Sequence, residues 1–315
     1  MAQIQVLQGA GARAGPGREI EALSLSRRLP SLIVAARQAA SSLVHGVHGR
    51  RRAGAGETFW QFRPYVMGEP TGRIDWRRSA RDDRVYVRER EWEAAHTVWV
   101  WMDRSPSMAF MSSLAATSKI DRAIVLGLAA ADLLVRGGER VGVLDLTRPM
   151  ASRSIIERLG QALIEEERRP GYAARELPAA SALEPGAQAV LIGDFLSDPE
   201  QIGASLRSLA SRGASGHLVA IVDPAEETFP FVGHTEFLDV DSEARLRIGR
   251  AESVRELYLR RLGAHRDALR AMCLSRGWSF MIHRTDRPAS EALLALRVRL
   301  AGLGAAGAAP ILGRT

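Results

Sequence analysis

From residue 97 to residue 300, short apolar runs alternate with segments of helical spacing. Thr97–Met102 is a continuous apolar run, as expected of a strand that is buried on both faces of a sheet. Further strands are expected at 140–146, 187–193, 217–222 and 278–283. Helices are expected at 120–135, 154–166, 199–212, 253–276 and 289–300. Because strands that alternate with helices form sheets with crossover helices, this order predicts an α/β fold, a doubly wound, mostly parallel sheet with helices on both faces.

The expected boundaries divide the chain into four parts: a flexible N-terminus over 1–17, an N-terminal helix and Arg/Trp-rich segment over 18–92, the α/β domain over 93–301, and a flexible tail over 302–315. The α/β domain is expected to carry an insertion at about 223–250, with a hairpin around 235–248. Two serines are expected to cap helices. Ser118 precedes the helix at 120, and Ser154 has a glutamate at the capping-box position, Glu157.

Three of the predicted strands run directly into an aspartate: Asp103, Asp194 and Asp223. Ligands of open α/β sheets bind beyond the carboxyl ends of the strands, where the strand order reverses. Asp103 is followed by Ser105 and Ser107, so one loop carries a carboxylate and two hydroxyls at alternate positions. Oxygen ligands of this kind suit Mg²⁺ or another divalent cation, and Asp194 could face the same point from the next loop. The alternative is that Asp103 only caps the turn that follows it.

Two sets of motifs resemble known families. Asp103-x-Ser105-x-Ser107 together with Asp194 resembles the metal-ion-dependent adhesion site of von Willebrand factor A domains. A longer block resembles the signature of the family called domain of unknown function 58: Phe62-Arg63-Pro64-Tyr65-x-x-Gly68-Glu69-x-x-Gly72-Arg73-Ile74-Asp75-Trp76-Arg77-x-Ser79-Ala80-Arg81. The stretches 222–233, 258–265 and 285–288 are similar to that family as well. The resemblance covers about residues 20–300.

The resemblance implies a von Willebrand factor A-like domain preceded by a family-specific segment. It implies a non-catalytic role in the assembly, maturation or stress response of complexes. The implied partners are MoxR-type AAA+ ATPases and other von Willebrand A-domain proteins. The implied metal ligands are Asp103, Ser105, Ser107 and Asp194. The full adhesion site has a threonine in the loop before a middle helix. Here that loop, 147–154, has no clear equivalent, and Ser152 or Ser154 would have to substitute.

The segment from Arg63 to Arg90 interleaves eight arginines with three aromatic residues, Tyr65, Trp76 and Tyr86. Arginine and aromatic side chains stack and are enriched where proteins bind partners. A partner-binding surface here would use Arg63, Tyr65, Arg73, Asp75, Trp76 and Arg81. The alternative is a structural role, in which the block folds onto the acidic centre of the chain and Asp75 pairs internally with an arginine.

The net charge of +7 arises from 43 basic and 36 acidic residues, and every basic residue except Lys119 is an arginine. Residues 92–244 contain 13 basic and 22 acidic residues, so an acidic centre lies between basic flanks. This distribution favours internal docking or a protein partner and argues against a nucleic-acid binder.

A single cysteine, Cys273, and the absence of a signal-peptide pattern or a long apolar run predict a cytoplasmic protein without stable membrane insertion.

Motifs for catalysis are scarce in the sequence, which contains no P-loop, no nucleophile elbow and no zinc-ligand spacing. We therefore expect an adaptor that binds a protein partner through a divalent cation. One alternative is a metal-independent scaffold that docks through the Arg63–Arg90 block. The enzyme alternative is metal-assisted phosphoryl transfer by the pair Asp239 and Asp241.

Overall fold

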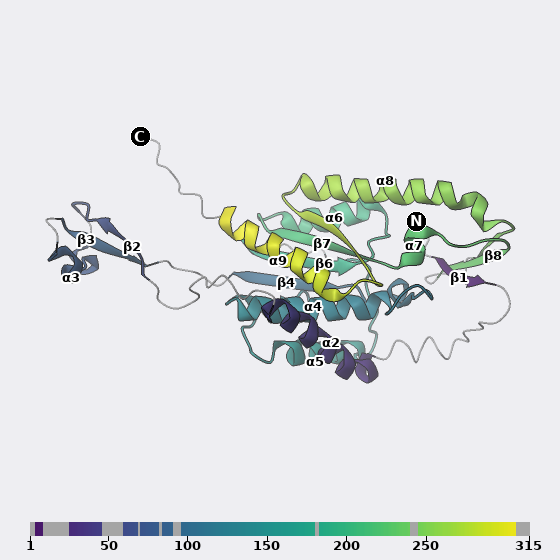
Figure 1. Ribbon diagram of the computed structural model, residues 1–315, viewed down its shortest axis with the longest axis horizontal. Coiled ribbons are helices and arrows are strands. Elements are labelled where there is room, and N and C mark those ends of the chain that lie inside the picture. The colour runs from purple at the N-terminus through teal and green to yellow at the C-terminus, as the bar shows by residue number, and fades with distance from the viewer. Residues whose placement is uncertain are drawn as a thin grey trace. The chain divides into compact units, whose positions relative to one another are not determined.

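A five-stranded sheet forms the framework of the larger part of the chain (Figure 1). The computed structural model describes residues 4–8, 25–45, 59–68, 70–81, 84–90, 96–179, 183–239 and 245–306. The strands of this sheet are β4 (Thr97–Met102), β5 (Arg140–Val143), β6 (Gln188–Gly193), β7 (Ser215–Val222) and β10 (Ser279–Arg284). All four neighbouring pairs are parallel. The predicted α/β fold with a parallel sheet is confirmed.

The order of the strands is β10-β7-β6-β4-β5. The chain moves from β4 to β5 at one edge and then returns to the other side of β4 with β6. The strand order therefore reverses at the β4–β6 pair, and the carboxyl ends of these two strands border the crevice where open α/β sheets bind ligands.

Helices cover both faces of this sheet. One face packs against α4 (Lys119–Arg136), α5 (Ile155–Glu167) and α9 (Ala289–Ala306), and the other against α6 (Pro199–Ala210) and α8 (Arg255–Leu274). Side chains of β4 alternate between the two hydrophobic clusters: Val100 and Met102 join the first and Trp101 the second. This alternation explains why β4 is apolar at successive positions.

Helix α2 (Leu25–His45) packs on α4, α5 and α9. Its apolar stripe, which includes Leu29 and Ala36, is part of the same core cluster as those helices. Helix α2 lies close to α5 at Gly160, where a Cβ atom would lie 3.0 Å from a methyl carbon of Leu29. The chain divides into two compact units, one made of 1–48 and 96–315 and the other of 49–95. The predicted part 18–92 is thus divided, because α2 belongs to the first unit.

The second unit, 49–95, is built on an antiparallel pair of strands, β2 (Phe59–Pro64) and β3 (Tyr86–Arg90). Between them lie a 3₁₀ turn, η1 (Thr71–Arg73), and a one-turn helix, α3 (Trp76–Ser79). The guanidinium of Arg78 lies 5.0 Å from the ring centroid of Tyr86. The expected stacking of arginine on an aromatic ring therefore occurs within this unit.

A small three-stranded sheet extends from the first unit. The hairpin β8 (Thr235–Asp239) and β9 (Arg245–Ile248) lies within the predicted range 235–248, which is confirmed. Strand β1 (Ile4–Gln8) pairs antiparallel with β8, a strand that the prediction of a flexible N-terminus over 1–17 did not anticipate. A 3₁₀ turn, η3 (Ala251–Val254), joins this sheet to α8.

Two local predictions were wrong, and the reasons are visible in hydrogen bonds. Strand β5 ends at Val143 and not at residue 146, because Asp145 adopts a left-handed φ of 62° and the Val143 amide donates to Thr147 Oγ1 at 2.9 Å. Ser154 precedes α5 but makes no capping hydrogen bond with its side chain. The expected cap of α4 is confirmed, since Ser118 Oγ accepts the amide of Asp121 at 3.2 Å.

None of the helices in the described ranges is both long and apolar enough to cross a membrane.

Candidate functional site

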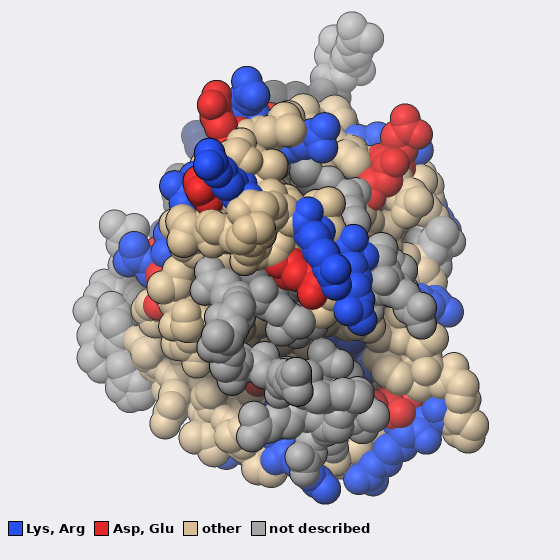
Figure 2. Space-filling model, turned by 90° about the vertical axis from the view of Figure 1, so that its right-hand side faces the viewer, with Lys and Arg blue, Asp and Glu red and all other residues tan. Residues whose placement is uncertain are grey.

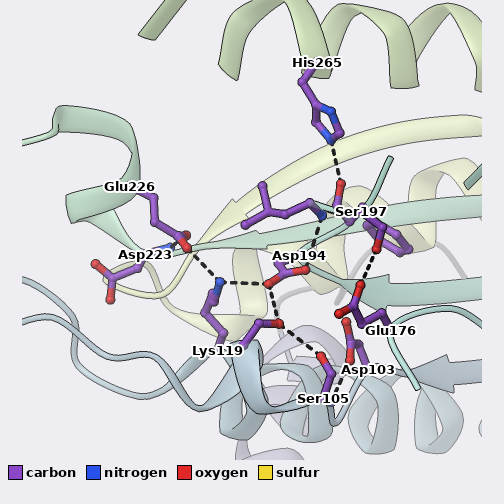
Figure 3. Close-up of polar contacts among 12 residues, drawn as sticks. Asp103, Ser105, Lys119, Glu176, Asp194, Ser197, Asp223, Glu226 and His265 are labelled. Atoms are coloured by element: carbon purple, nitrogen blue, oxygen red, sulfur yellow. Dashed lines mark hydrogen bonds and ion pairs between the residues drawn. The ribbon is translucent and has the colours of Figure 1, made fainter. Parts of the chain in front are cut away.

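The reversal of strand order brings the predicted site residues together. Asp103 follows β4 and Asp194 follows β6, and both carboxylates lie at the same end of the sheet (Figure 3). Ser105 and Ser107 come from the loop after β4, where a 3₁₀ turn, η2 (Pro106–Ala109), bends the chain back over the strand ends. All four side chains are buried, with relative exposures of 6% or less. We call these four residues the strand-end cluster.

A chain of hydrogen bonds links the strand-end cluster. The Ser105 amide donates to Asp103 Oδ1 at 2.8 Å, so Asp103 also caps the turn that follows it, as the alternative interpretation proposed. Ser105 Oγ and Ser107 Oγ are 3.0 Å apart, and Ser107 Oγ donates to Asp194 Oδ2 at 2.9 Å. The other oxygen of the first aspartate, Asp103 Oδ2, is buried and has no hydrogen-bond partner.

Lys119, the first residue of α4, completes this arrangement and was not predicted from the sequence. Its Nζ atom lies 3.0 Å from Asp194 Oδ2 and 2.7 Å from Glu226 Oε1, between the two carboxylates (Figure 3). Its side chain is only 2% exposed. A signal was present, since Lys119 is the only lysine in a chain with 42 arginines. Sequence reasoning can single out this one departure from the bias, because a compact ammonium and a guanidinium fork are not interchangeable at a buried site.

Electrostatics at the site follow from burial and from the number of carboxylates. Burial raises the pKa of Asp103 well above its usual value, and the neighbouring charge of Asp194 raises it further. Burial also raises the pKa of Glu226. For Lys119, burial lowers the pKa, but the carboxylates of Asp194 and Glu226 outweigh burial and hold it above its usual value. The amine is therefore a buried cation that contacts two of the three nearby carboxylates and balances one negative charge.

The residue that follows Asp194 has an unusual backbone conformation. This residue, Phe195, is buried and adopts a left-handed φ of 51°, which is uncommon for a residue with a side chain. His265 of α8 stabilises this kink, because its Nε2 donates to the Phe195 carbonyl at 2.7 Å (Figure 3). Strained backbone is often found at functional sites.

Asp223, the third strand-end aspartate, has a different role. It caps the short helix α7 (Pro224–Thr228) in a full capping box, in which the Glu226 side chain accepts the Asp223 amide. Its carboxylate also accepts the amide of Ser112 at 2.8 Å. Asp223 thus aligns the helix that presents Glu226 to Lys119.

The donor set of the strand-end cluster fits a hard cation in part. Two carboxylates and two hydroxyls converge, and the unpartnered Asp103 Oδ2 is the kind of atom that a bound cation would satisfy. Against this, Asp194 Oδ2 is already shared by Ser107 and Lys119. Within the described ranges, no group of three or more His, Cys, Asp or Glu side chains is arranged to hold a metal ion. A cation here would depend on the serine oxygens.

Comparison with known proteins places the chain in a family. Residues 61–268, about two thirds of the chain, match the family model described as "Protein of unknown function DUF58". The chain belongs to this family. The matched residues include most of unit 49–95, the strand-end cluster, Lys119 and Glu226, so the DUF58 match covers both features singled out from the sequence.

Individual relatives are similar over most of their length. An uncharacterized protein of Mycobacterium bovis is 26% identical over 282 residues, which span 85% of this chain and 87% of the relative. Two uncharacterized proteins of Mycobacterium tuberculosis match with the same identity and coverage. These similarities agree with membership of the DUF58 family.

In the loop expected to supply a threonine ligand, 147–154, the hydroxyl groups make hydrogen bonds to neighbouring residues. Thr147 Oγ1 accepts the amide of Val143 at the end of β5. Ser152 Oγ and Ser154 Oγ lie 3.1 Å apart in an exposed loop, and Ser154 Oγ also contacts Arg158 Nε at 3.3 Å. These hydroxyls therefore serve local structure.

The residues predicted for partner binding all lie in unit 49–95. Trp76 is 65% exposed, and Arg81 is exposed as well. Asp75 has a structural role, because its carboxylate accepts the amide of Arg78 and caps α3. Tyr65 is partly buried, and the side chains of Arg63 and Arg73 lie outside the described part of the chain.

Of the aspartate pair considered for phosphoryl transfer, Asp239 is the last residue of β8, and its side chain is outside the described residues. Asp241 lies outside them altogether. The surface at this end of the larger unit mixes basic and acidic side chains among neutral ones (Figure 2).

Proposed function

We propose that this chain is a non-enzymatic adaptor with a von Willebrand factor A-like domain. In this proposal the strand-end cluster binds a divalent cation, and an acidic side chain of a protein partner completes the coordination. The observation that carries the proposal is the buried Asp103 Oδ2, which has no hydrogen-bond partner and lies in a loop with two serine hydroxyls. The position of the cluster at the reversal of strand order supports it.

The proposed partner is a MoxR-type AAA+ ATPase or a client protein that such an ATPase remodels, together with other von Willebrand A-domain proteins. This part of the proposal rests on the resemblance of the sequence to its family. In this scheme the chain contributes binding and positioning, and the ATPase contributes the energy of nucleotide hydrolysis.

Calorimetric titration of Mg²⁺ into the full chain tests the cation site. Asp103→Asn keeps the acceptor for the Ser105 amide but removes the charge, and we expect it to abolish the binding heat. Asp198→Asn is the matched control, because Asp198 caps α6 and is not one of the four cluster residues, and asparagine caps helices equally well. Equal heats from Asp103→Asn and the wild type would refute the cation site.

A second candidate is a metal-independent scaffold that docks through unit 49–95. The exposed apolar side chains of this unit favour it, since Met67 is 97% exposed and Trp76 65% exposed. Capture of the ATPase on the immobilised chain separates the candidates. Loss of capture in chelator supports the cation-dependent adaptor, whereas capture that survives chelator but is lost in Trp76→Ala supports the scaffold.

A further inference from the structure

A cation of the protein's own, the ammonium of Lys119, already contacts the strand-end cluster. The Lys119 ammonium contacts Asp194 and Glu226 at 3.0 and 2.7 Å, and it is buried at the point where the loops after β4 and β6 meet (Figure 3). The ring of Phe110 lies 5.9 Å from Nζ and adds an aromatic face to this environment. Such an ion pair has an ordered geometry, because both partners are held by hydrogen bonds to other groups.

A divalent cation and this ammonium would need the same carboxylate. Asp194 contributes Oδ2 to Ser107 and to Lys119, and Asp194 Oδ1 receives only a long contact from the Leu196 amide at 3.4 Å. Two cations on one buried carboxylate repel each other strongly, because little water screens them. We therefore expect lysine and metal to compete for Asp194.

Glu226 gives the displaced lysine a second position. The Glu226 side chain is 18% exposed, whereas that of Asp194 is 3% exposed, so Glu226 lies nearer to solvent. A lysine that leaves Asp194 can keep its bond to Glu226 Oε1 and turn towards solvent. The Glu226 carboxylate is itself held by the capping box of α7, so this movement would be limited to the lysine side chain.

We propose that Lys119 acts as a built-in cation that closes the strand-end cluster, and that a divalent cation must displace it from Asp194 in order to bind. The identity of the competing ligand rests on the proposed function; the role of Lys119 rests on its contacts. The cluster is then a two-state switch. By linkage, a lysine that weakens metal binding is itself released when metal binds.

Amine labelling of the wild-type chain tests this switch directly, because Lys119 is the only lysine. The full chain, made without a lysine-containing tag, is treated with an N-hydroxysuccinimide ester, and peptide mapping follows Lys119. Without divalent cation we expect Lys119 to stay unmodified while the α-amino group reacts. Saturating Mg²⁺ is expected to speed its modification by about tenfold or more. Rapid labelling without Mg²⁺ would overturn the proposal, as would protection that persists while calorimetry shows Mg²⁺ bound.

A variant provides the second measurement. Lys119→Met retains the length of the side chain without its charge, and we expect it to bind Mg²⁺ about ten- to a hundredfold more tightly than the wild type. In Lys119→Met the carboxylates of Asp194 and Glu226 lose their cation. If this single variant does not fold, the double variant Lys119→Met/Glu226→Gln takes its place, because it removes one of these two unpaired charges. Equal affinity in wild type and variant overturns the switch and leaves the cation site intact. Binding by the variant alone supports the switch and refutes cation binding by the native chain. Binding by neither refutes both.

Discussion

Gly193, the last residue of β6, lies against the carboxylate of Asp103. A Cβ atom at this position would lie 2.9 Å from Asp103 Cβ, a distance that forces one of the two backbones to move. Glycine is required here by the close approach of two neighbouring strand ends and not by its backbone conformation. The geometry of the strand-end cluster therefore depends on a residue that has no side chain.

We predict that Gly193→Ala destabilises the protein by about 1–3 kcal/mol, because overpacking displaces Asp103 and its hydrogen bond to Ser105. Gly263→Ala in α8 is the control. A Cβ atom at Gly263 would have no other atom within 4 Å, and alanine favours a helix, so this variant should gain about 0.5–1 kcal/mol. Urea unfolding of both variants measures the two shifts. A Gly193→Ala variant as stable as the wild type would show that the loop adapts freely.

The residues of the strand-end cluster could be predicted because each one follows a recognisable strand. Asp103, Ser105, Ser107 and Asp194 needed only the rule that parallel strands end at one edge. Glu226 and Lys119 could not be placed in this way. Lys119 opens a helix and not a loop after a strand, and its contact with Glu226 bridges 107 positions of sequence. Only tertiary structure brings these two charges together.

At the scale of elements, β7 and β10 bury two histidines within the parallel sheet. His217 of β7 contacts Ser279 Oγ of β10 through Nδ1 at 2.7 Å, and His283 of β10 is also buried. Burial lowers the pKa of each imidazole to about 4, with a further contribution from Arg299 at His217 and from Arg122 at His283. Both imidazoles are therefore neutral in the folded protein above that pH.

These two elements should make the fold acid-sensitive. Between pH 6.5 and 4 the unfolded chain binds protons at both histidines and the folded chain does not, so stability falls as the pH is lowered through this window. Each histidine accounts for at most about 3 kcal/mol. Chemical denaturation at a series of pH values should give a shallower slope of unfolding free energy against pH for His283→Gln than for the wild type. Identical slopes for His283→Gln and the wild type would contradict this account.

Element types were predictable where the pattern was strong, and element boundaries depended on single side chains. The sheet strands and the long helices have clear periodicity. The early end of β5 depends on the left-handed conformation of Asp145, which no pattern encodes. Likewise β1 is too short to be identified alone, and its strand exists because β8 offers an edge to pair with.

At the scale of the whole molecule, unit 49–95 is inserted into the larger unit between α2 and β4. The hydrophobic clusters of the larger unit, as far as the structure describes them, contain residues from α2 and from 96 onwards but none from 49–95. A boundary drawn at residue 93 would therefore separate α2 from the core that it covers.

We predict that replacing residues 49–95 with a short Gly/Ser linker leaves the larger unit folded, with a cooperative thermal transition and a circular dichroism spectrum that retains the signal of the long helices. A chain that begins at residue 93 should instead lose cooperativity or aggregate, because α4, α5 and α9 lose the side chains of α2 that pack on them. The prediction fails if the chain beginning at 93 melts as cooperatively as the chain without the insertion.

The packing of α2 against α9 also governs when the protein can finish folding during its synthesis. Helix α2 leaves the ribosome early, and more than 240 residues must be added before α9 begins. At cellular rates of elongation this takes roughly 10 to 50 s. Throughout that interval part of the apolar stripe of α2 has no final partner. Closure of this side of the core must therefore wait until the residues of α9 have been synthesised.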